Sequence, residues 1–485
     1  MAWFLIFVAA SCTRAEPSAS PVVGGDSATS DAVAATSDAA ARGVAEPTTP
    51  AASDAEWDLP ARPDIRSGQI AASVTETFAF VVPSLRGGAL DARVAAALGA
   101  SADARLGWVV SDLLRLSGPD DYAPLIDAFT RITGADIARA AASDGTDVWK
   151  AATDMLIAWD LPAPPGYLAF KRELFLALEP RWAPIFSDAG ADIDWRFLSW
   201  GGVLPDDRPL GDDGACVRGC IPSLDDPKMT GASAGAWYPD DRIVFGVSLG
   251  GEAVAFPKNV MEVHEMVNFT IAGRRVAMAY CTLCGSAEAY FTDRVPGSTD
   301  PLVMRTSGLL FLSNKVMYDL ASWSAFDTFN GRAVSGPLHR AGVALPRLNI
   351  VVSRWDAWRV AHPAGTIVAA DGGIGRTYEL DPLNGRDDNG PIFPVRRSDT
   401  RLAPHVQVLG VLAADGSAVA FPVDEARAVL AAGGEVRSNG IVVEADAGGL
   451  RATIAGRSIP TQQAFWFAWA QFHPDSALWT RTKPG

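Results

Sequence analysis

Two stretches of the chain share one pattern of residues, and this internal repeat constrains the fold more than any other feature of the sequence. Residues 243–267 read IVFGVSLGGEAVAFPKNVMEVHEMV, and residues 406–430 read VQVLGVLAADGSAVAFPVDEARAVL. Each stretch has an apolar run, a turn with Gly or Asp-Gly, a second run ending in Ala-Phe-Pro, and a segment of helical character. The repeat predicts two strand–turn–strand–helix units and a duplicated half-domain.

A different pattern precedes the repeat. Apolar residues recur at helical spacing between about Leu90 and Leu178, in four runs separated by Gly, Pro or Asp breakers: 106–114, 122–132, 149–159 and 168–178. We expect a helical bundle, or a helical-repeat-like array, over residues 57–200. After Trp195 short strands with Gly, Pro and Asp turns predict a mainly β domain over 201–485, so the predicted fold class is α+β.

The length and net charge of the chain limit the classes of protein to which it can belong. The 485 residues, with 15 Trp and 21 Phe, are enough for two or three folded units with large cores. The formal net charge is -15, from 56 acidic and 41 basic residues, and no Lys/Arg-rich run occurs. Because nucleic-acid binding depends on neutralising phosphates, this composition indicates no nucleic-acid partner.

The N-terminus predicts export. MAWFLIFVAASC is a short apolar run leading into Cys12, typical of a signal peptide over residues 1–12 with a lipobox-like cysteine as the lipidation site. No basic residue precedes the run and Ala9 stands where Leu is usual, so a simple secretory signal is the alternative. Residues 13–56 lack aromatic residues and predict a disordered linker. We expect a cell-envelope lipoprotein, periplasmic or extracellular, held to a membrane by its lipid and meeting a protein partner there.

Residues 276–291, VAMAYCTLCGSAEAYF, place two cysteines in a turn between two strand-forming segments. In an exported protein such a pair forms a structural disulfide, works as a redox dithiol or binds a metal. Thioredoxin-like sites place the motif at the start of a long helix, whereas here a strand follows Gly285. All three alternatives therefore remain, on a scaffold unlike thioredoxin.

The two repeats differ in chemistry. The first carries His264 and leads into Cys281 and Cys284, while the second has Arg427 and Ala428 in the corresponding region and no cysteine. If both copies adopt the same fold, the side chains that only one copy carries are not required for folding. This contrast indicates that the first copy carries the function.

Several motifs in order resemble the bacterial domain of unknown function 3179 (DUF3179) family, over roughly residues 200 to 480. They are GCIPSLDDPK (219–228), HEMVN (264–268), AYCTLCGSA (279–287), SGLLFLSNKVMYD (307–319), GRAVSGPL (331–338), WDAWRVAHP (355–363) and FWFAWAQFHPD (465–475). The resemblance implies an architecture and a short list of residues, but no reaction. Phe269 stands where an acidic residue is common, and Leu312 where a polar one is usual.

A ligand set follows from these motifs. We expect His264, in HEMVN, to join Cys281 and Cys284 in a site for copper or zinc, with Met317 as a soft fourth ligand. Glu265 is a candidate catalytic base if a metal-bound water reacts. Cys216 and Cys220 are expected to form a disulfide, because the family does not generally carry that pair.

Polar residues near the motifs are candidate cleft residues: Asn268, Ser307, Asn314 and Asp319. Together these features predict metal handling or thiol redox chemistry at the cell envelope, with Cys281 and Cys284 as the reacting groups. One alternative is a structural or binding module in which the cysteine pair is a disulfide staple. A second is a metal-assisted hydrolase, and whether the protein is an enzyme stays open.

Overall fold

The computed structural model describes residues 59–386, 390–395, 399–413 and 415–481, and Leu59–Gly485 forms one compact unit. The predicted signal peptide over 1–12, with Cys12, and the predicted linker over 13–56 lie outside the described residues. Within the described ranges, no helix is long and apolar enough to cross a membrane.

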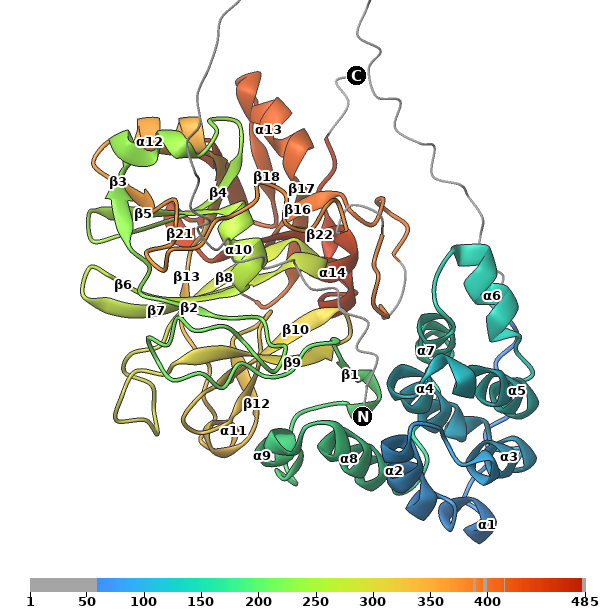
Figure 1. The fold of residues 1–485 in the computed structure, drawn as a ribbon. Helices are drawn as coiled ribbons and strands as arrows, with labels where there is room; N and C mark the ends of the chain where they lie inside the picture. The colour runs from blue at the N-terminus through green and yellow to red at the C-terminus, as the bar shows by residue number, and fades with distance from the viewer. Residues whose placement is uncertain (1–58, 387–389, 396–398, 414, 482–485) are drawn as a thin grey trace, which may run out of the picture. The chain divides into compact units, whose positions relative to one another are not determined.

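Helices fill the first part of the described chain (Figure 1): α1 (Ala72–Thr75), α2 (Phe78–Gly87), α3 (Ala92–Ala100), α4 (Gly107–Leu116), α5 (Tyr122–Thr133), α6 (Ile137–Asp144), α7 (Val148–Ala158), α8 (Tyr167–Leu178) and α9 (Ala183–Phe186). The four predicted helical runs coincide with α4, α5, α7 and α8. Gly134 and Gly145 end α5 and α6 in the left-handed conformation that glycine adopts without strain.

One arginine joins the helices to the first strand. Arg115, on α4, donates from Nη2 to the carbonyl oxygen of Trp200 at 2.7 Å, and its guanidinium lies 4.5 Å from the ring centroid of Trp149 on α7. A buried guanidinium is stabilised by such carbonyl and aromatic contacts. The helices and the strands that follow therefore pack as parts of one unit.

Strands dominate from Leu198 onward and form five sheets in the described chain. The first contains β1 (Leu198–Trp200), β9 (Met304–Phe311), β10 (Asn314–Asp319), β11 (Ala325–Asp327) and β12 (Arg332–Ser335). The second contains β13 (Arg347–Leu348), β8 (Ser286–Phe291), β7 (Arg274–Cys281), β6 (Met266–Ile271) and β2 (Leu224–Asp225). Helices and strands thus occupy largely separate stretches, and the fold class is α+β.

The remaining sheets contain the two repeat stretches. One has the order β14 (Val351–Arg354), β4 (Ile243–Leu249), β5 (Glu252–Pro257), β15 (Thr366–Val368) and β3 (Met229–Gly231). Another has the order β22 (Thr461–Phe465), β16 (Gln407–Leu412), β17 (Ala418–Pro422) and β23 (Ala477–Leu478). The last has β18 (Val436–Ser438), β19 (Ile441–Asp446), β20 (Gly449–Ile454) and β21 (Arg457–Ile459).

The first two of these sheets are built alike. In each, a central strand, β4 or β16, pairs antiparallel with both of its neighbours. The next strand in the sheet then runs parallel to the strand beside it: β15 beside β5, and β23 beside β17. Helix α10 (Lys258–His264) follows β5, and α13 (Val423–Ala431) follows β17. The predicted strand–turn–strand–helix order is therefore present in both stretches.

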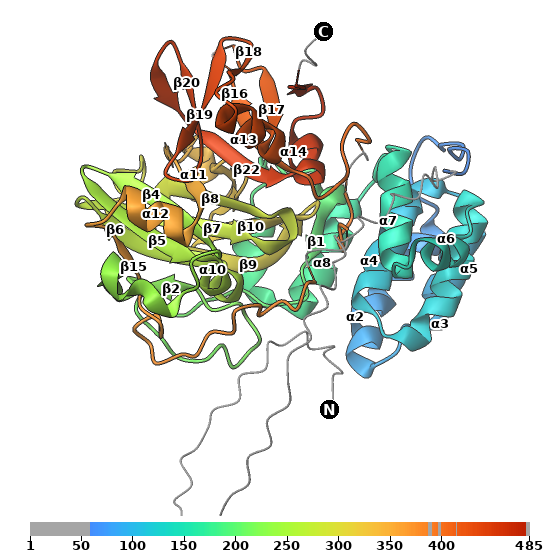
Figure 2. The ribbon, with the colours of Figure 1, turned by 90° about the horizontal axis from the view of Figure 1, so that it is seen from above.

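A second helix packs on each of these sheets. Helix α12 (Trp355–Ala361) follows β14 and contacts β4, while α14 (Trp466–Phe472) follows β22 and contacts β16 (Figure 2). Strand β22 also contacts β8 of the second sheet. The sheet that contains the second repeat stretch therefore borders, through β22, the strand that follows the C-x-x-C turn. The short helix α11 (Pro337–Arg340) follows β12.

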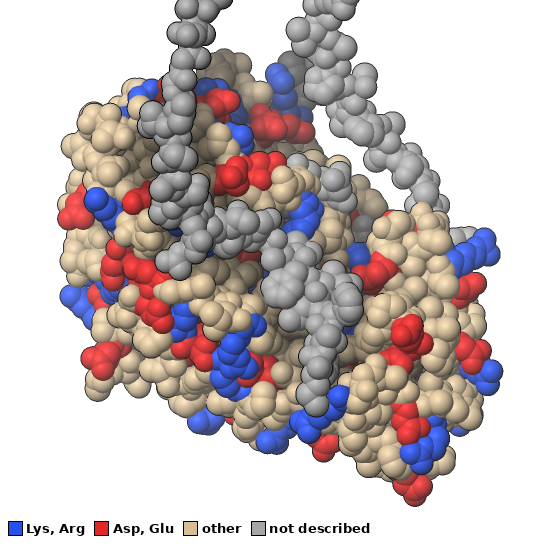
Figure 3. Space-filling view, viewed as in Figure 1, with Lys and Arg blue, Asp and Glu red and all other residues tan. Residues whose placement is uncertain are grey.

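Charged side chains are interspersed over the face shown in Figure 3. Lys and Arg lie next to Asp and Glu in small groups, with uncharged residues between them. Many pairs are exposed, such as Arg451 with Glu444 at 2.8 Å. Exposed ion pairs of this kind contribute little to stability.

Candidate functional site

The C-x-x-C motif forms the turn between β7 and β8. Cys281 ends β7, Thr282–Cys284 forms a short 3-10 helix, and Gly285 adopts the left-handed conformation with φ of 56° before β8 begins. A glycine tolerates this φ without strain, so the chain reverses at once into the returning strand. The strand–turn–strand expected from the sequence is present.

Both cysteines of the turn are reduced and closed to solvent. Cys281 is 1% exposed and Cys284 is 0% exposed, and neither forms a disulfide. Their Sγ atoms lie 3.8 and 3.5 Å from the same acceptor, the carbonyl oxygen of Ser313. Burial, together with a hydrogen bond between the two thiols, raises the pKa of Cys284 well above its ordinary value. Cys284 is thus held as a neutral thiol next to the second free cysteine.

Polar side chains from distant segments surround these sulfurs. The amide oxygen of Asn314 lies 3.7 Å from Cys284 Sγ. Gln471, on α14, donates from Nε2 to Ser313 Oγ at 2.8 Å, while its own Oε1 has no hydrogen-bond partner in the described chain. Buried polar atoms without partners are rare in proteins and mark sites that call for explanation.

A buried carboxyl group on β8 acts on the thiols. Glu288 is 4% exposed; its Oε1 accepts a hydrogen bond from Gln462 Nε2 at 2.6 Å, and its Oε2 has no partner among the described residues. Burial raises the pKa of Glu288 to about 7. The negative charge of an ionised Glu288 also contributes to the raised pKa of Cys284, so the two groups are electrostatically coupled.

Gln462 connects Glu288 to an arginine. It lies on β22, and its Oε1 accepts a hydrogen bond from Arg347 Nη1 at 3.3 Å. Arg347 also donates from Nη2 to the carbonyl oxygen of Phe329. The positive charge of Arg347 lowers the pKa of Glu288 and so offsets part of the increase that burial causes. A chain of side chains therefore runs from Arg347 to the cysteine turn.

Glu265 lies beside the turn as one half of an ion pair. Its Oε2 lies 2.9 Å from Lys315 Nζ, and its Oε1 accepts a hydrogen bond from Thr282 Oγ1 at 3.1 Å. Lys315 Nζ also donates to the carbonyl oxygen of Glu265 at 2.8 Å. With both oxygens engaged, Glu265 fixes the turn to β10 and is not poised as a catalytic base.

His264 does not join the sulfurs, and the predicted three-ligand site is wrong in this respect. Its Nδ1 lies 2.6 Å from the carbonyl oxygen of Pro222, and its Nε2 lies 2.8 Å from the hydroxyl of Tyr378. Burial lowers the pKa of His264 to about 4, so the ring is neutral at pH 7. Among described residues, His264 belongs to no group of His, Cys, Asp or Glu ligand atoms close enough to share a metal ion.

The pairing of β6 with β7 explains this outcome. His264 ends α10, and Glu265 then adopts a left-handed φ of 52° before β6 begins. Tyr280 donates its backbone N–H to the carbonyl oxygen of Glu265 at 2.9 Å, next to Cys281. The register therefore puts Glu265 opposite the cysteine turn, while the imidazole of His264 lies against Pro222 and Tyr378.

Met317 and most candidate cleft residues also lie elsewhere. Met317 packs in a core cluster with Met266 and Phe326, separate from the cluster of the two cysteines. The other side chains make local or structural bonds: Asn268 to Asp225 at 2.9 Å, Ser307 to the carbonyl of Val316 at 2.5 Å, and Asp319 to the backbone of Ser322 at 2.8 Å. Of the four candidates, only Asn314 reaches a sulfur.

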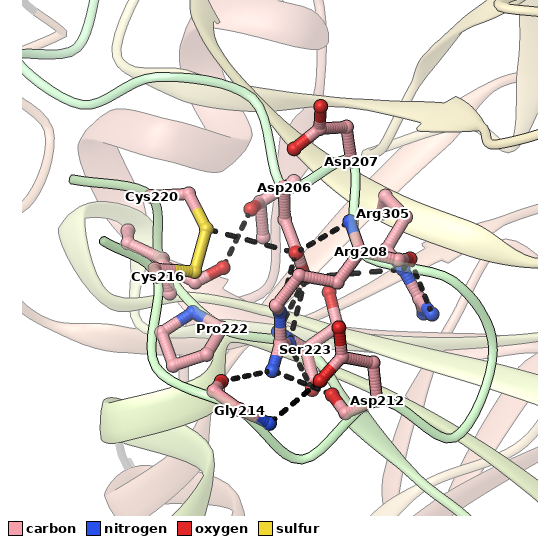
Figure 4. Close-up of a disulfide and its surroundings, with 12 residues drawn as sticks. Asp206, Asp207, Arg208, Asp212, Gly214, Cys216, Cys220, Pro222, Ser223 and Arg305 are labelled. Carbon is pink, nitrogen blue, oxygen red and sulfur yellow. Dashed lines mark hydrogen bonds and ion pairs between the residues drawn. A yellow bond between two sulfur atoms is a disulfide. The ribbon is translucent and has the colours of Figure 1, made fainter. Parts of the chain in front are cut away.

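The other two described cysteines form a disulfide between Cys216 and Cys220, in a loop before β2 (Figure 4). Cys220 Sγ lies 3.6 Å from Asp206 Oδ1. Asp206 and these cysteines are the one group in the described chain whose ligand atoms all lie within 4.8 Å of one another. Bonded to each other, however, the sulfurs have no thiolate to offer a metal.

Asp206 is already paired with arginine. Its oxygens accept hydrogen bonds from Arg208 Nε at 2.7 Å and from the backbone N–H of Ser223 at 2.8 Å, and Arg305 Nε lies 3.8 Å away (Figure 4). Burial alone raises its pKa, but the bonds from Arg208 and Ser223 outweigh burial and lower it. This carboxylate neutralises guanidinium groups inside the fold, which is a structural role.

Sequence reasoning missed Glu288, Gln462 and Arg347. A signal for Glu288 exists: in SAEAYF it is the charged residue of an otherwise apolar strand, four positions after Cys284. Gln462 and Arg347 carry no local signal, because their relevance depends on β22 and β13 packing beside β8. These partners come from segments far apart in the chain.

Fold and site together define an α+β protein with a buried, reduced cysteine pair at a strand turn. Residues 218–458 match the profile of the family described as "Protein of unknown function (DUF3179)", and this part of the chain belongs to that family. The matched range contains the C-x-x-C turn, while the motif at 465–475 lies beyond it. No curated protein and no solved structure matches the chain.

Proposed function

We propose that Cys281 and Cys284 are a redox dithiol that exchanges electrons with the disulfide of a partner protein. When the pair is oxidised, the sulfur–sulfur bond of the partner breaks and a bond forms between Cys281 and Cys284. The two thiol protons end on the two sulfurs of the partner, so atoms and electrons balance. The reverse reaction reduces the pair.

The observation that carries this proposal is the electrostatic coupling of a buried pair of free cysteines to a buried carboxyl group on the neighbouring strand. Thiol–disulfide exchange proceeds through a thiolate, which burial disfavours. Glu288, with a pKa of about 7 and one oxygen without a partner, is placed to accept the proton of Cys284. A base whose pKa lies near the working pH is the most effective proton acceptor.

Access sets a condition on this chemistry. Since Cys281 and Cys284 are 1% and 0% exposed, a partner disulfide reaches them only when covering residues move. Gln471 and Trp466, on α14, belong to the polar and apolar cover of the pair. Thiol–disulfide exchange therefore requires a local opening of the residues that cover the two cysteines. If only the correct partner protein induces this opening, the pair reacts with that partner and not with other disulfides.

Copper binding is the second candidate function, and the adjacent sulfurs favour it. Two thiolates suit Cu(I), the softest of the metals expected here. His264 and Met317 take no part, so any such site uses the two sulfurs. The hydrolase alternative is not carried forward, because Glu265 is paired with Lys315 and no metal-ligand group surrounds it in the described chain.

We further propose export and lipid anchoring at Cys12, at the periplasmic or extracellular face of the cell envelope. The apolar run before Cys12 supports this, and so does the Cys216–Cys220 disulfide, because disulfides persist in oxidising compartments. Labelling of cells with a radioactive fatty acid tests it. Incorporation that is lost in Cys12→Ala is expected, and equal labelling of both chains contradicts the anchor.

We also propose that the two similar sheets arose by duplication and that residues 57–200 and 201–485 are separate evolutionary domains. Trp358 and Trp469 occupy like positions on the helices that pack on the two sheets, and each packs at a tilt against the histidine four residues later, with ring centroids 4.2 and 4.1 Å apart. The second copy has no cysteine, so the fold does not require the thiols. Their presence shortly after the first copy, with no counterpart after the second, supports a functional role.

The redox proposal is tested by equilibrating the folded chain, in a Cys12→Ser background, in glutathione buffers of graded ratio. After acid quenching and thiol labelling, mass spectrometry of the peptide with Cys281 and Cys284 gives the oxidised fraction. We expect a reversible two-electron transition that is absent in Cys281→Ser and Cys284→Ser. The variant Cys216→Ala/Cys220→Ala is the matched control and retains the transition.

Two results overturn the proposal. One is a pair that stays reduced in every buffer while the chain is folded, and the other is oxidation that occurs only together with unfolding. Copper bound near one per chain in purified protein, lost in Cys281→Ser, favours the copper function instead. In the redox case, Glu288→Gln slows exchange most at pH 8, where only the wild type has an ionised carboxylate.

A further inference from the structure

A cavity of about 650 Å³ lies beside β13, which carries Arg347, and beside β16, which pairs with the strand of Gln462. Its walls come from α9 and β1 with the residues between them, from β9 to β13, from β16 and from α14. The volume is within the range of about 300 to 1,000 Å³ that small-molecule sites have. Neither cysteine of the pair lines this cavity, although Arg347, which is bonded to Gln462, does.

Most of its lining is apolar. Ile193, Leu198, Phe311 and Val316 contribute aliphatic and aromatic surface, and Trp469 adds an indole. Such a lining favours the apolar body of a ligand, because burying that body removes it from water.

Two charged side chains on the lining have no partner. Asp192 and Arg332 are exposed, and within the described chain neither side chain has a hydrogen bond or an ion pair. The other charged pair differs: Asp327 accepts bonds from the backbone of Phe329 and Asn330, and Arg347 is bonded to Gln462. Asp192 and Arg332 are therefore the charges available to a ligand.

These two groups lie at the same edge of the cavity. Arg332 and Val334 both belong to β12, and both line the cavity. The backbone N–H of Asp192 donates to the carbonyl oxygen of Val334 at 2.8 Å. The segment of Asp192 is thus bonded to the strand of Arg332, and a free carboxylate and a free guanidinium both line the apolar cavity.

We infer that this cavity binds a small zwitterion with a large apolar side chain, of the class of the apolar amino acids. The ammonium group of the ligand pairs with Asp192 and its carboxylate with Arg332, which offers bidentate geometry. The side chain enters the apolar part, toward Phe311 and Trp469. This inference is independent of the thiol chemistry proposed above.

Calorimetric titration of the full chain with L-tryptophan tests the inference. N-acetyl-L-tryptophan lacks the ammonium group and L-tryptophanamide lacks the carboxylate, so each removes one of the two contacts. We expect saturable binding of L-tryptophan and at least about tenfold weaker binding of both derivatives, since loss of one charge-assisted bond costs at least about 1.4 kcal/mol.

Variants assign each contact. In Arg332→Gln we expect L-tryptophan and its amide to bind alike, and in Asp192→Asn we expect L-tryptophan and its N-acetyl form to bind alike. Ala344→Trp places a bulky side chain at an exposed position of the lining and should abolish binding. Arg294→Gln changes an exposed arginine that is not part of the lining and should leave binding unchanged. No heat of binding, equal affinity for all three compounds, or unchanged preference in the variants overturns the inference.

Discussion

Trp469 lies directly on Gly410, so close that a Cβ added to this glycine would come 2.1 Å from Cζ3 of the indole. Trp358 lies on Gly246 in the same way, with a distance of 2.3 Å. Real Cβ contacts are never this short, so neither position tolerates a side chain without movement of a buried tryptophan. In each of the two similar sheets, the helix can pack closely only because a glycine leaves room for its tryptophan.

Substitution of either glycine by alanine is therefore expected to destabilise the protein. Overpacking of a core costs about 1–3 kcal/mol, and we expect about 2–3 kcal/mol for Gly410→Ala and for Gly246→Ala. Urea unfolding gives the change in the free energy of unfolding. Gly118→Ala is the control, because Gly118 has an extended conformation and open space around it, and it should change stability by less than about 0.5 kcal/mol. Midpoints equal to wild type in both core variants would contradict this packing.

The buried ion pair of Arg305 and Asp225 gives a second prediction. Arg305 is 0% exposed and donates from Nη1 and Nη2 to the two oxygens of Asp225 at 2.9 and 2.7 Å. Arg305→Met leaves Asp225 buried without its cation, and loss of one partner of a buried pair costs about 3–5 kcal/mol. The exposed pair of Arg451 and Glu444 is the control: Arg451→Met should cost less than about 1 kcal/mol. Similar losses in the two variants would show that burial does not govern the effect.

Four of the longer helices were predictable because their apolar faces are regular. α4, α5, α7 and α8 each show several buried apolar residues at helical spacing. α6 was missed because its sequence IARAAASD buries only Ile137 and Ala141, which leaves no apolar stripe. α2 was missed too, and it contains Pro83, a residue that normally argues against a helix interior.

The cysteine turn was predictable and its surroundings were not. Spacing and Gly285 identify a turn between strands, and the register of β7 with β8 follows from it. Whether His264 or Glu265 faces that turn depends on a left-handed φ at Glu265, a residue type that gives no signal for it. Glu288 meets Gln462 across 174 positions of sequence, and only the packed fold brings them together.

The disulfide gives a third prediction. Cys216 and Cys220 close a short loop of five residues. By restricting the unfolded chain, a disulfide over a loop of this length is expected to raise the free energy of unfolding by about 2 kcal/mol. The ring also holds Arg218, whose Nη2 lies 2.9 Å from the buried Glu179. Dithiothreitol should therefore lower the free energy of unfolding of the wild type by about 2 kcal/mol.

The same reductant should leave the variant Cys216→Ala/Cys220→Ala unchanged, because Cys281 and Cys284 are already reduced. Unfolding curves with and without dithiothreitol provide the measurement. If the reductant destabilises the double variant as much as the wild type, a bond other than Cys216–Cys220 is being broken, and the assignment of Cys281 and Cys284 as free thiols fails.

The last prediction concerns pH and Glu288. Its pKa in the folded protein is about 7, whereas an unfolded glutamate titrates near about 4.3. Between these values the folded state binds more protons than the unfolded state, so stability falls as pH rises. The stability that this carboxyl contributes is fully present below about pH 4 and lost through about pH 7, a change on the order of 3 kcal/mol at 1.36 kcal/mol for each pKa unit.

Glu288→Gln removes this titration but keeps an oxygen that accepts the bond from Gln462 Nε2. Unfolding free energies of wild type and variant should be close at pH 4.5, and at pH 8 the variant should be the more stable by on the order of 3 kcal/mol. Subtracting one profile from the other cancels the other titrating groups, which both proteins share. A difference that is constant with pH would mean that Glu288 is ionised in the fold already near pH 5, and the carboxyl could then not serve as the proton acceptor for Cys284 near neutral pH.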